Sequence, residues 1–286
     1  MRLSKSLQLT VGVLIFVLVA GLVMAAGPYK LAFRMKKGQR LTYKMKMALD
    51  QSVEMMGQEM TSTVNNATTL RLEVEEVSKD GKITFVYAVD SLQAHVKNAM
   101  MRMDSIFKNP DGLIGKRTRI TIMPNGKRVS SVVVDSVKLA PMMMQLLGSR
   151  QNSFGFVELP DKELKPGDSW THDKADTIAQ GSGQIVIGTA TTYTVAGEVD
   201  TLGYKCLRLA SKGKTTLKGE GEQMGAKLFF EGEGPTSGAA YFAVKEGLLV
   251  AVVSDADLEA TIAVTGPQNM TIPQTTSTKT SLVLVK

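Results

Sequence analysis

The sequence predicts an all-β protein: a duplicated, strongly curved antiparallel sheet or half-open β-barrel, with one or two short helices. Two observations predict this fold. Hydrophobic and polar residues alternate with a period of two along much of the chain, which is typical of strands that bury one face. In addition, residues 36–42 and 164–171 share a Lys-x-Gly opening, and each is followed by β-type segments in a similar order. The pattern therefore favours two related β units over an enzyme scaffold.

Residues 1–25 are predicted to be a signal peptide. Arg2 and Lys5 precede an uncharged apolar stretch, and Val23-Met24-Ala25 has the small-x-small form of a cleavage site. The alternative is an uncleaved anchor through residues 7–26. No cysteine lies near the cleavage site, which excludes a lipid-anchored leader. We expect an exported protein, either periplasmic or secreted, or membrane-anchored if the leader remains.

Residues 27–150 are predicted to form the first β half-unit, in a meander. Residues 41–49 place large apolar side chains at odd positions, as in a half-exposed strand. Residues 70–75 and 83–89 are joined across an Asp-Gly step that suits a hairpin. Another hairpin is predicted around Pro124-Asn125-Gly126.

A short helix near residues 141–147 is predicted to end the first half-unit. Pro141 suits the first helical position and Gly148 the position after the end. The helix is apolar almost all round, so we expect it to plug or cap the sheet. Residues 97–107 fit either a helix or a strand.

Residues 151–286 are predicted to form the second β half-unit, packed with the first as one domain. It repeats the strands and turns of the first and adds a final pair of strands, residues 258–264 and 276–285. Trp170 is expected to anchor its core, Asp168 to fix the strand entry through an Asx-type hydrogen bond, and Cys206 to be a buried strand residue.

Charge and motifs exclude several classes of function. The net charge of +7 falls to +5 without Arg2 and Lys5, and the basic residues are scattered, so we expect no nucleic-acid partner. Weak contact with an anionic membrane surface is compatible with this charge. The two histidines lack metal-ligand spacing, and no nucleophile elbow or phosphate loop occurs. We therefore expect no enzyme, no metal and no cofactor.

Methionine is the positive signal. Twelve of the 17 methionines lie between Met45 and Met144, several of them in clusters. Flexible thioethers fill irregular cores, form adaptable apolar surfaces, or bind soft metals such as copper(I), and the sequence leaves all three open. The residues predicted to contact an apolar ligand are Tyr43, Met45, Met47, Met101, Met103, Met142, Met143 and Leu146.

At Gly167-Asp168-Ser169-Trp170, preceded by Leu159-Pro160 and Leu164-Lys165-Pro166, the chain resembles a group of uncharacterised exported bacterial proteins. Members open each half with a Lys-x-Gly-(Asp/Gln)-x-(Trp/Leu/Tyr) strand entry. In outline the chain is also similar to periplasmic lipoprotein and lipid carriers of the LolA and LppX kind. That second resemblance is architectural and carries no residue roles.

These observations predict a non-enzymatic exported protein that binds an apolar or amphipathic ligand, such as a lipid or lipoprotein, in a β-sheet concavity. The alternative is a structural or assembly component of the cell envelope, which would contact an envelope protein partner through its sheet edge or methionine surface. A hydrolase is a third alternative, for which His172 and Asp168 are the residues to test.

Overall fold

The computed structural model describes residues 27–110, 112–136, 156–180, 183–223, 225–266 and 269–285. These residues contain twelve β-strands and no helix, which confirms the predicted all-β class. The strands are β1 (Arg40–Met55), β2 (Gln58–Val77), β3 (Ile83–Asn98), β4 (Met103–Lys108), β5 (Arg117–Ile122), β6 (Arg128–Val133), β7 (Ser169–Gln180), β8 (Gly183–Thr201), β9 (Tyr204–Gln223), β10 (Ala226–Ala243), β11 (Leu248–Thr265) and β12 (Met270–Val285).

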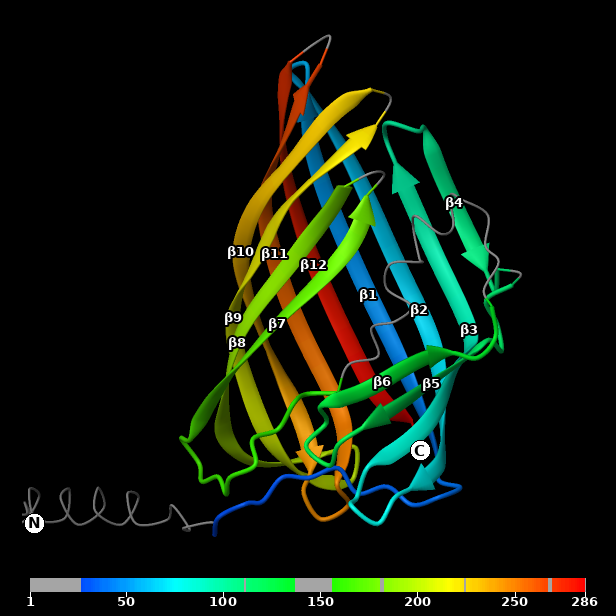
Figure 1. Ribbon diagram of the computed structural model, residues 1–286, viewed down its shortest axis with the longest axis vertical. Coiled ribbons are helices and arrows are strands. Elements are labelled where there is room, and N and C mark those ends of the chain that lie inside the picture. The colour runs from blue at the N-terminus through cyan, green and yellow to red at the C-terminus, as the bar shows by residue number, and fades with distance from the viewer. Residues whose placement is uncertain are drawn as a thin grey trace, which may run out of the picture.

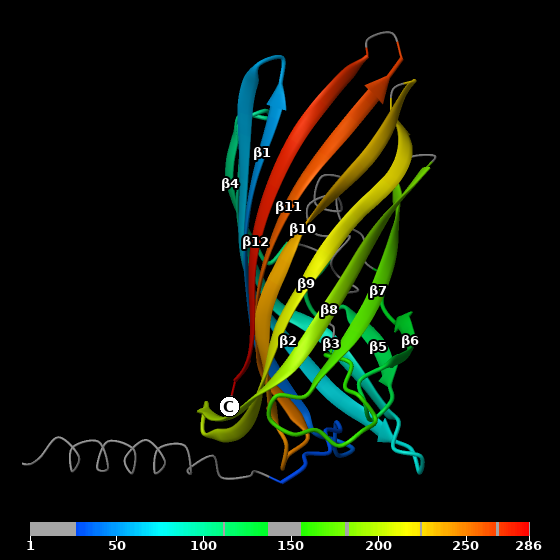
Figure 2. The same cartoon turned by 90° about the vertical axis from the view of Figure 1, so that its left-hand side faces the viewer.

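All twelve strands belong to one strongly curved sheet (Figures 1 and 2). The strand order is β6-β5-β3-β2-β1-β12-β11-β10-β9-β8-β7, and β4 pairs with β3 beside β5. From β7 to β12 each strand pairs with the next one in sequence. Strand β12 then pairs with β1, and the order continues through β2, β3 and β5 to β6. Within the described residues β6 does not pair with β7, so the sheet is a half-open barrel and not a closed one, as the sequence predicted.

The two Lys-x-Gly turns enter the sheet with the same hydrogen bonds. The Gly38 amide donates to the Val74 carbonyl (2.8 Å), and the Gly167 amide donates to the Val195 carbonyl (2.8 Å). Each valine amide donates back to the residue after the glycine, at 2.9 Å in both turns. Both glycines have positive φ, 79° and 91°, which a side chain would disfavour. The repeated sequence therefore encodes a repeated turn.

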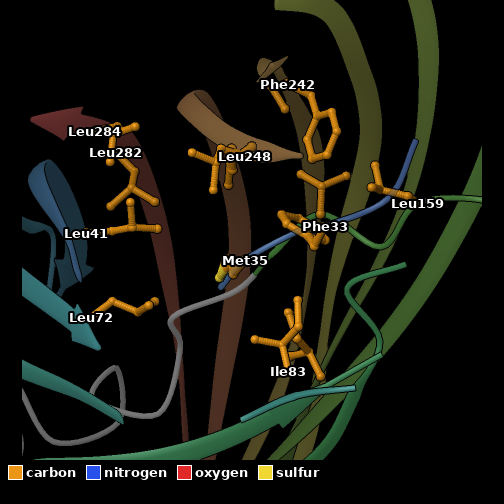
Figure 3. Close-up of a cluster of buried hydrophobic side chains, with 14 of the residues drawn as sticks. Phe33, Met35, Leu41, Leu72, Ile83, Leu159, Phe242, Leu248, Leu282 and Leu284 are labelled. Carbon is orange, nitrogen blue, oxygen red and sulfur yellow. The ribbon is translucent and has the colours of Figure 1, made fainter. Parts of the chain in front are cut away.

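A closed hydrophobic core fills one end of the curved sheet, which we call the proximal end (Figure 3). The segments that precede β1 and β7 cross this end and meet in a bridge between Tyr29 and Leu164. Phe33 contacts Phe156 and Phe242 edge-on, with ring centroids 4.6 and 5.2 Å apart. This core occupies the concave side, so the strand face that contributes to it is the inner face.

The register assigns every strand residue to one face. On β1 the odd-numbered residues from Leu41 to Val53 point inward, as the alternation predicted, and Lys44 and Lys46 point outward. On β9 and β10 many inward positions are glycines. A Cβ on Gly234 would lie 1.9 Å from the Asp257 carbonyl oxygen, and one on Gly219 would lie 2.4 Å from the Gln184 carbonyl oxygen. The absence of side chains lets these strands curl tightly.

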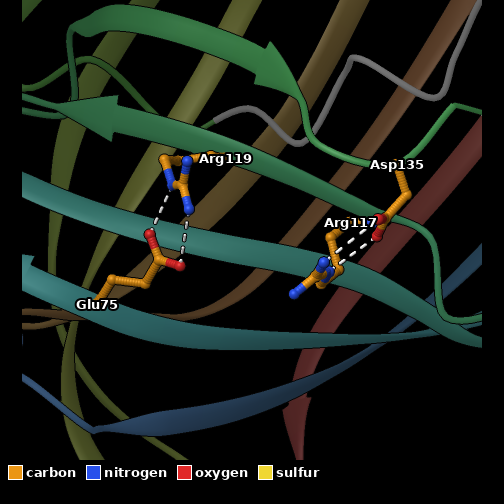
Figure 4. Close-up of polar contacts among 4 residues, drawn as sticks. All are labelled: Glu75, Arg117, Arg119 and Asp135. Atoms are coloured by element: carbon orange, nitrogen blue, oxygen red, sulfur yellow. Dashed lines mark hydrogen bonds and ion pairs between the residues drawn. The ribbon is translucent and has the colours of Figure 1, made fainter.

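The β5–β6 hairpin closes one edge of the sheet and is held by two ion pairs (Figure 4). Arg119 on β5 contacts Glu75 on β2 at 2.6 and 3.2 Å, and Arg117 contacts Asp135 at 2.8 and 3.2 Å. Hydrogen bonds from Arg119 lower the pKa of Glu75, and those from Arg117 lower the pKa of Asp135. Both pairs are exposed to solvent, which screens their charges, so they orient the hairpin more than they stabilise it.

The structure shows the conformation of several segments and residues that the sequence analysis singled out. Residues 97–107, which fitted helix or strand, form the end of β3, a turn and most of β4. Asp168 accepts a hydrogen bond from the Lys165 amide (2.7 Å), which confirms its role at the strand entry.

Trp170 packs against the core and its Nε1 donates to the Glu158 carbonyl (3.1 Å). Cys206 is fully buried on β9, as predicted. The helix near residues 141–147 lies outside the described residues.

Candidate functional site: the inner face of the sheet

The inner face stays apolar beyond the closed core. Toward the opposite end, which we call the distal end, the register aligns one apolar residue from each of five strands in a single transverse row. This distal row consists of Ile178, Ile185, Phe230, Ile262 and Ile272. All five side chains are half-buried, and none belongs to a hydrophobic cluster formed by described residues. The row is apolar surface that no described core element covers.

A polar belt separates the distal row from the core on β8, β9, β10 and β12, whereas β11 contributes Ala256 and Leu258 at this level. Its inward residues are mostly threonine and glycine: Thr189, Thr191, Gly213, Thr215, Gly234, Thr236, Thr276 and Thr278. The threonine hydroxyls offer hydrogen bonds without charge, and the glycines leave space between them. Along these strands the inner face therefore alternates between an apolar end, a neutral polar middle and an apolar core, an arrangement that suits an amphipathic molecule.

On β1 and β2 the inner face combines methionine with two unpartnered polar atoms. Met45 lies opposite Thr68 and Met47 lies opposite Asn66. The Oγ1 of Thr68 and the Oδ1 of Asn66 are buried and have no hydrogen-bond partner among the described residues. Thr68 is only 5% exposed. A buried polar atom without a partner costs about 1–3 kcal/mol, so these atoms mark a place where a hydrogen-bond donor from a ligand would be stabilised.

The structure separates the residues that the sequence grouped as one ligand site. Met45, Met47 and Met103 lie on the inner face, and Met47 and Met103 share a cluster with Val64 and Val96. Tyr43 is fully buried in the core, where its hydroxyl donates to the Leu249 carbonyl (2.8 Å), so it lines no open surface.

Met101 does not join them, because it is 53% exposed in the turn between β3 and β4. The remaining predicted contacts, Met142, Met143 and Leu146, lie outside the described residues.

The sequence analysis did not predict the distal row, because the apolar signal on which it relied, the methionine clusters, lies in the first half of the chain. A signal for it was present: residues 185–187 and 228–230 carry large apolar side chains among glycine, threonine and charged residues. Their alignment across five strands depends on register, however, and register is set by pairing over the whole sheet.

Each of the two histidines contacts one carboxylate. His95 contacts Asp104 (2.6 Å) on the outer face, and this hydrogen bond lowers the pKa of Asp104. His172 lies 3.6 Å from Glu158 at the other edge of the sheet. Within the described ranges no three His, Cys, Asp or Glu side chains are placed to hold a metal ion.

The outer face of β9–β11 is charged. It borders a hollow of about 1640 Å³ whose lining includes Lys214, Glu233 and Glu259. Lys214 and Glu233 form an ion pair at 2.6 Å. The ionised groups of these strands therefore lie on the outer face, together with the exposed Phe229 and Val253, and the distal row lies on the inner one.

Comparisons with known proteins give no family. No protein-family model matches the chain, and no curated protein sequence matches it. Among solved structures it is similar to an outer membrane channel from Pseudomonas putida F1, with 9% identity, a TM-score of 0.21, and coverage of 89% of this chain and 98% of the other.

Two further structures show similarly low values. The translocator domain of the autotransporter NalP from Neisseria meningitidis is 7% identical, with a TM-score of 0.19 and coverage of 96% and 94%. OccK11 from Pseudomonas aeruginosa is 8% identical, with a TM-score of 0.20 and coverage of 90% and 100%. In the described part of this chain, no helix has the length and apolar character needed to cross a membrane.

Proposed function

We propose that this is a non-enzymatic, exported protein that binds an apolar or amphipathic ligand of the lipid class on the inner face of its sheet. The observation that supports the proposal most directly is the distal row of Ile178, Ile185, Phe230, Ile262 and Ile272, which no described core element covers. Acyl chains gain about 0.8 kcal/mol per buried CH₂, so such a row favours a hydrocarbon ligand.

The polar features of the inner face support an amphipathic ligand over a plain hydrocarbon. The unpartnered atoms of Asn66 and Thr68 accept hydrogen bonds, and the threonine belt can donate or accept them. A head group with hydroxyl or amide donors would complement these atoms, while its chain would lie against apolar residues.

Adjacent phenylalanines provide a matched test. Phe230 points inward in the distal row, and Phe229 points outward and is 42% exposed. The protein is extracted gently and analysed by native mass spectrometry, and bound lipid is identified after denaturation. We expect Phe230→Asp to lower the bound fraction at least about tenfold and Phe229→Asp to leave it within twofold.

Wild-type protein that is consistently free of ligand, and does not take up a fluorescent fatty acid, would contradict the proposal. Equal loss in both phenylalanine variants would show that ligand retention does not depend on the inner face. Thermal unfolding of both variants checks that they remain folded.

The alternative function, an assembly component of the envelope, is favoured by the edge strand β6. All six of its residues are exposed, and Val129, Val132 and Val133 are each more than half exposed. Exposed strand edges with apolar side chains are sites for pairing with another chain. Recovery of one stoichiometric protein partner without lipid, lost on changing Val132 to Lys, would favour this function.

A further inference from the structure

The outer face of β1–β4 carries three lysines that converge on one shallow hollow. Lys46, Ala67, Gln93 and Lys108 form a single transverse row across the four strands, and Lys44 lies one step along β1. The hollow has a volume of about 380 Å³. Ala67, which is exposed, lies next to Lys46 in this row. Because its side chain is small, the lysine side chains extend farther from the sheet than it does.

No described carboxylate pairs with these three lysines. The cross-strand neighbours of Lys44, Lys46 and Lys108 are uncharged. On β9, by contrast, Lys214 and Lys218 pair with glutamates on β10. The three lysines therefore form a local cluster of positive charge on an outer face of β1–β4 that elsewhere also carries acidic residues, among them Glu54, Glu59, Glu73 and Asp104.

One exposed apolar side chain, Ile106 on β4, lies close to the lysines, and others lie farther along the strands at the distal turns. Ile106 on β4 is 57% exposed on the same outer face, and Met100 and Met101 in the β3–β4 turn are 56% and 53% exposed. The β3–β4 and β1–β2 turns lie at the same end of the sheet (Figure 1), and the latter carries Met56, which is 82% exposed. Unpaired lysines near exposed apolar residues are typical of a protein surface that meets a bilayer.

We propose that the outer face of β1–β4 docks on a membrane surface rich in anionic lipids, with Lys44, Lys46 and Lys108 facing the head groups. Met100, Met101 and Ile106 enter the interfacial layer. A hydrated soluble polyanion would use the lysines and gain nothing from these apolar residues, which is why a bilayer is the partner that fits. This docking is independent of the ligand proposed for the inner face, and it would bring that face close to a source or acceptor of lipid.

The test is flotation of the purified protein with vesicles of zwitterionic lipid, or of the same lipid with one third anionic lipid. Each lysine near an anionic surface strengthens binding about fivefold, so changing all three to Gln should weaken binding about 100-fold. The matched control changes Lys205, Lys212 and Lys227 to Gln, which removes the same charge from exposed positions outside the patch. We expect less than a threefold effect from it.

A second variant distinguishes a bilayer from a soluble polyanion. Changing Met100 and Met101 to Ser should weaken vesicle binding severalfold and leave binding to soluble polyphosphate unchanged. Wild-type protein that binds both vesicle types equally would overturn the docking proposal, as would equal losses in the two lysine variants. Neither result bears on ligand retention by the inner face, which native mass spectrometry measures separately.

Discussion

The amide of Gly38 donates to the carbonyl of Val74 at 2.8 Å, and the Val74 amide donates back to the residue beside that glycine. Gly167 and Val195 make the same pair of contacts in the second half of the sheet. Val74 and Val195 are each 1% exposed, so both turns attach a strand entry to a fully buried position. The repeated Lys-x-Gly sequence therefore corresponds to a repeated turn, which begins each half of the sheet with the same two backbone hydrogen bonds.

We predict that Gly38→Ala and Gly167→Ala each lower the free energy of unfolding by about 1–2 kcal/mol, because both glycines have positive φ. Gly27→Ala is the control, since Gly27 has no positive φ and a Cβ there meets no atom within 4 Å. Urea unfolding measures all three. A loss at Gly38 with none at Gly167 would mean that the two turns differ in their contribution to folding.

We predict that Gly234→Ala destabilises the sheet by roughly 1–3 kcal/mol, because the new Cβ would overlap the backbone of β11. Gly188→Ala is the matched control. Its Cβ would meet the Thr216 hydroxyl at 2.7 Å, and that side chain can rotate away. Equal thermal stability of the two variants would contradict the conclusion that inward glycines permit the tight curl.

We predict that Thr68→Val raises the stability of ligand-free protein by about 1 kcal/mol, since it removes a buried hydroxyl that has no described partner. The same change should reduce the fraction of protein that retains ligand. Thr69→Val on the opposite face is the control. Lower stability of ligand-free Thr68→Val would show that the hydroxyl is satisfied in the folded protein.

We predict that the Cys206 thiol is unreactive in the folded protein. Burial, reinforced by Glu246 and Asp200, raises its pKa from 9.0 to about 11. The folded state therefore holds this proton more tightly than the unfolded state does. The associated stabilisation is complete below pH 9 and is lost between pH 9 and 11.

Thiol labelling at pH 8 should proceed only after unfolding. Urea unfolding at pH 8 and pH 10.5 should give a smaller decline with pH for Cys206→Ala than for the wild type. Rapid labelling of folded protein would contradict the burial of this thiol.

The sequence predicted the repeated elements well, because their signals are local. Alternation identified the strand around Met45 and Met47, and the Asp-Gly and Asn-Gly steps identified hairpins. The position of Asp168 at the strand entry could also be predicted, although its carboxylate accepts from the Lys165 amide three residues earlier and not from the residue two positions later, as an Asx turn would require.

The candidate site could be predicted only in part. Alternation places Tyr43 and Met47 on the same face of β1, but it does not say which positions along that face are covered. Tyr43 lies at the proximal end, where residues 28–39 cross the sheet and close the core. The distal row involves strands that are far apart in the sequence, and no local pattern relates Ile178 to Ile272.

By itself the sequence determined the class of the protein: an all-β chain, two similar strand entries, and an apolar face on strands such as β1. These follow from backbone conformational preferences and from the two-residue period of a strand, which are local properties. Only the tertiary structure decided the order and register of the twelve strands, and that the distal row and the lysines of β1–β4 lie on opposite faces. Those relationships depend on register between distant strands and on the glycines that let β9 and β10 curl.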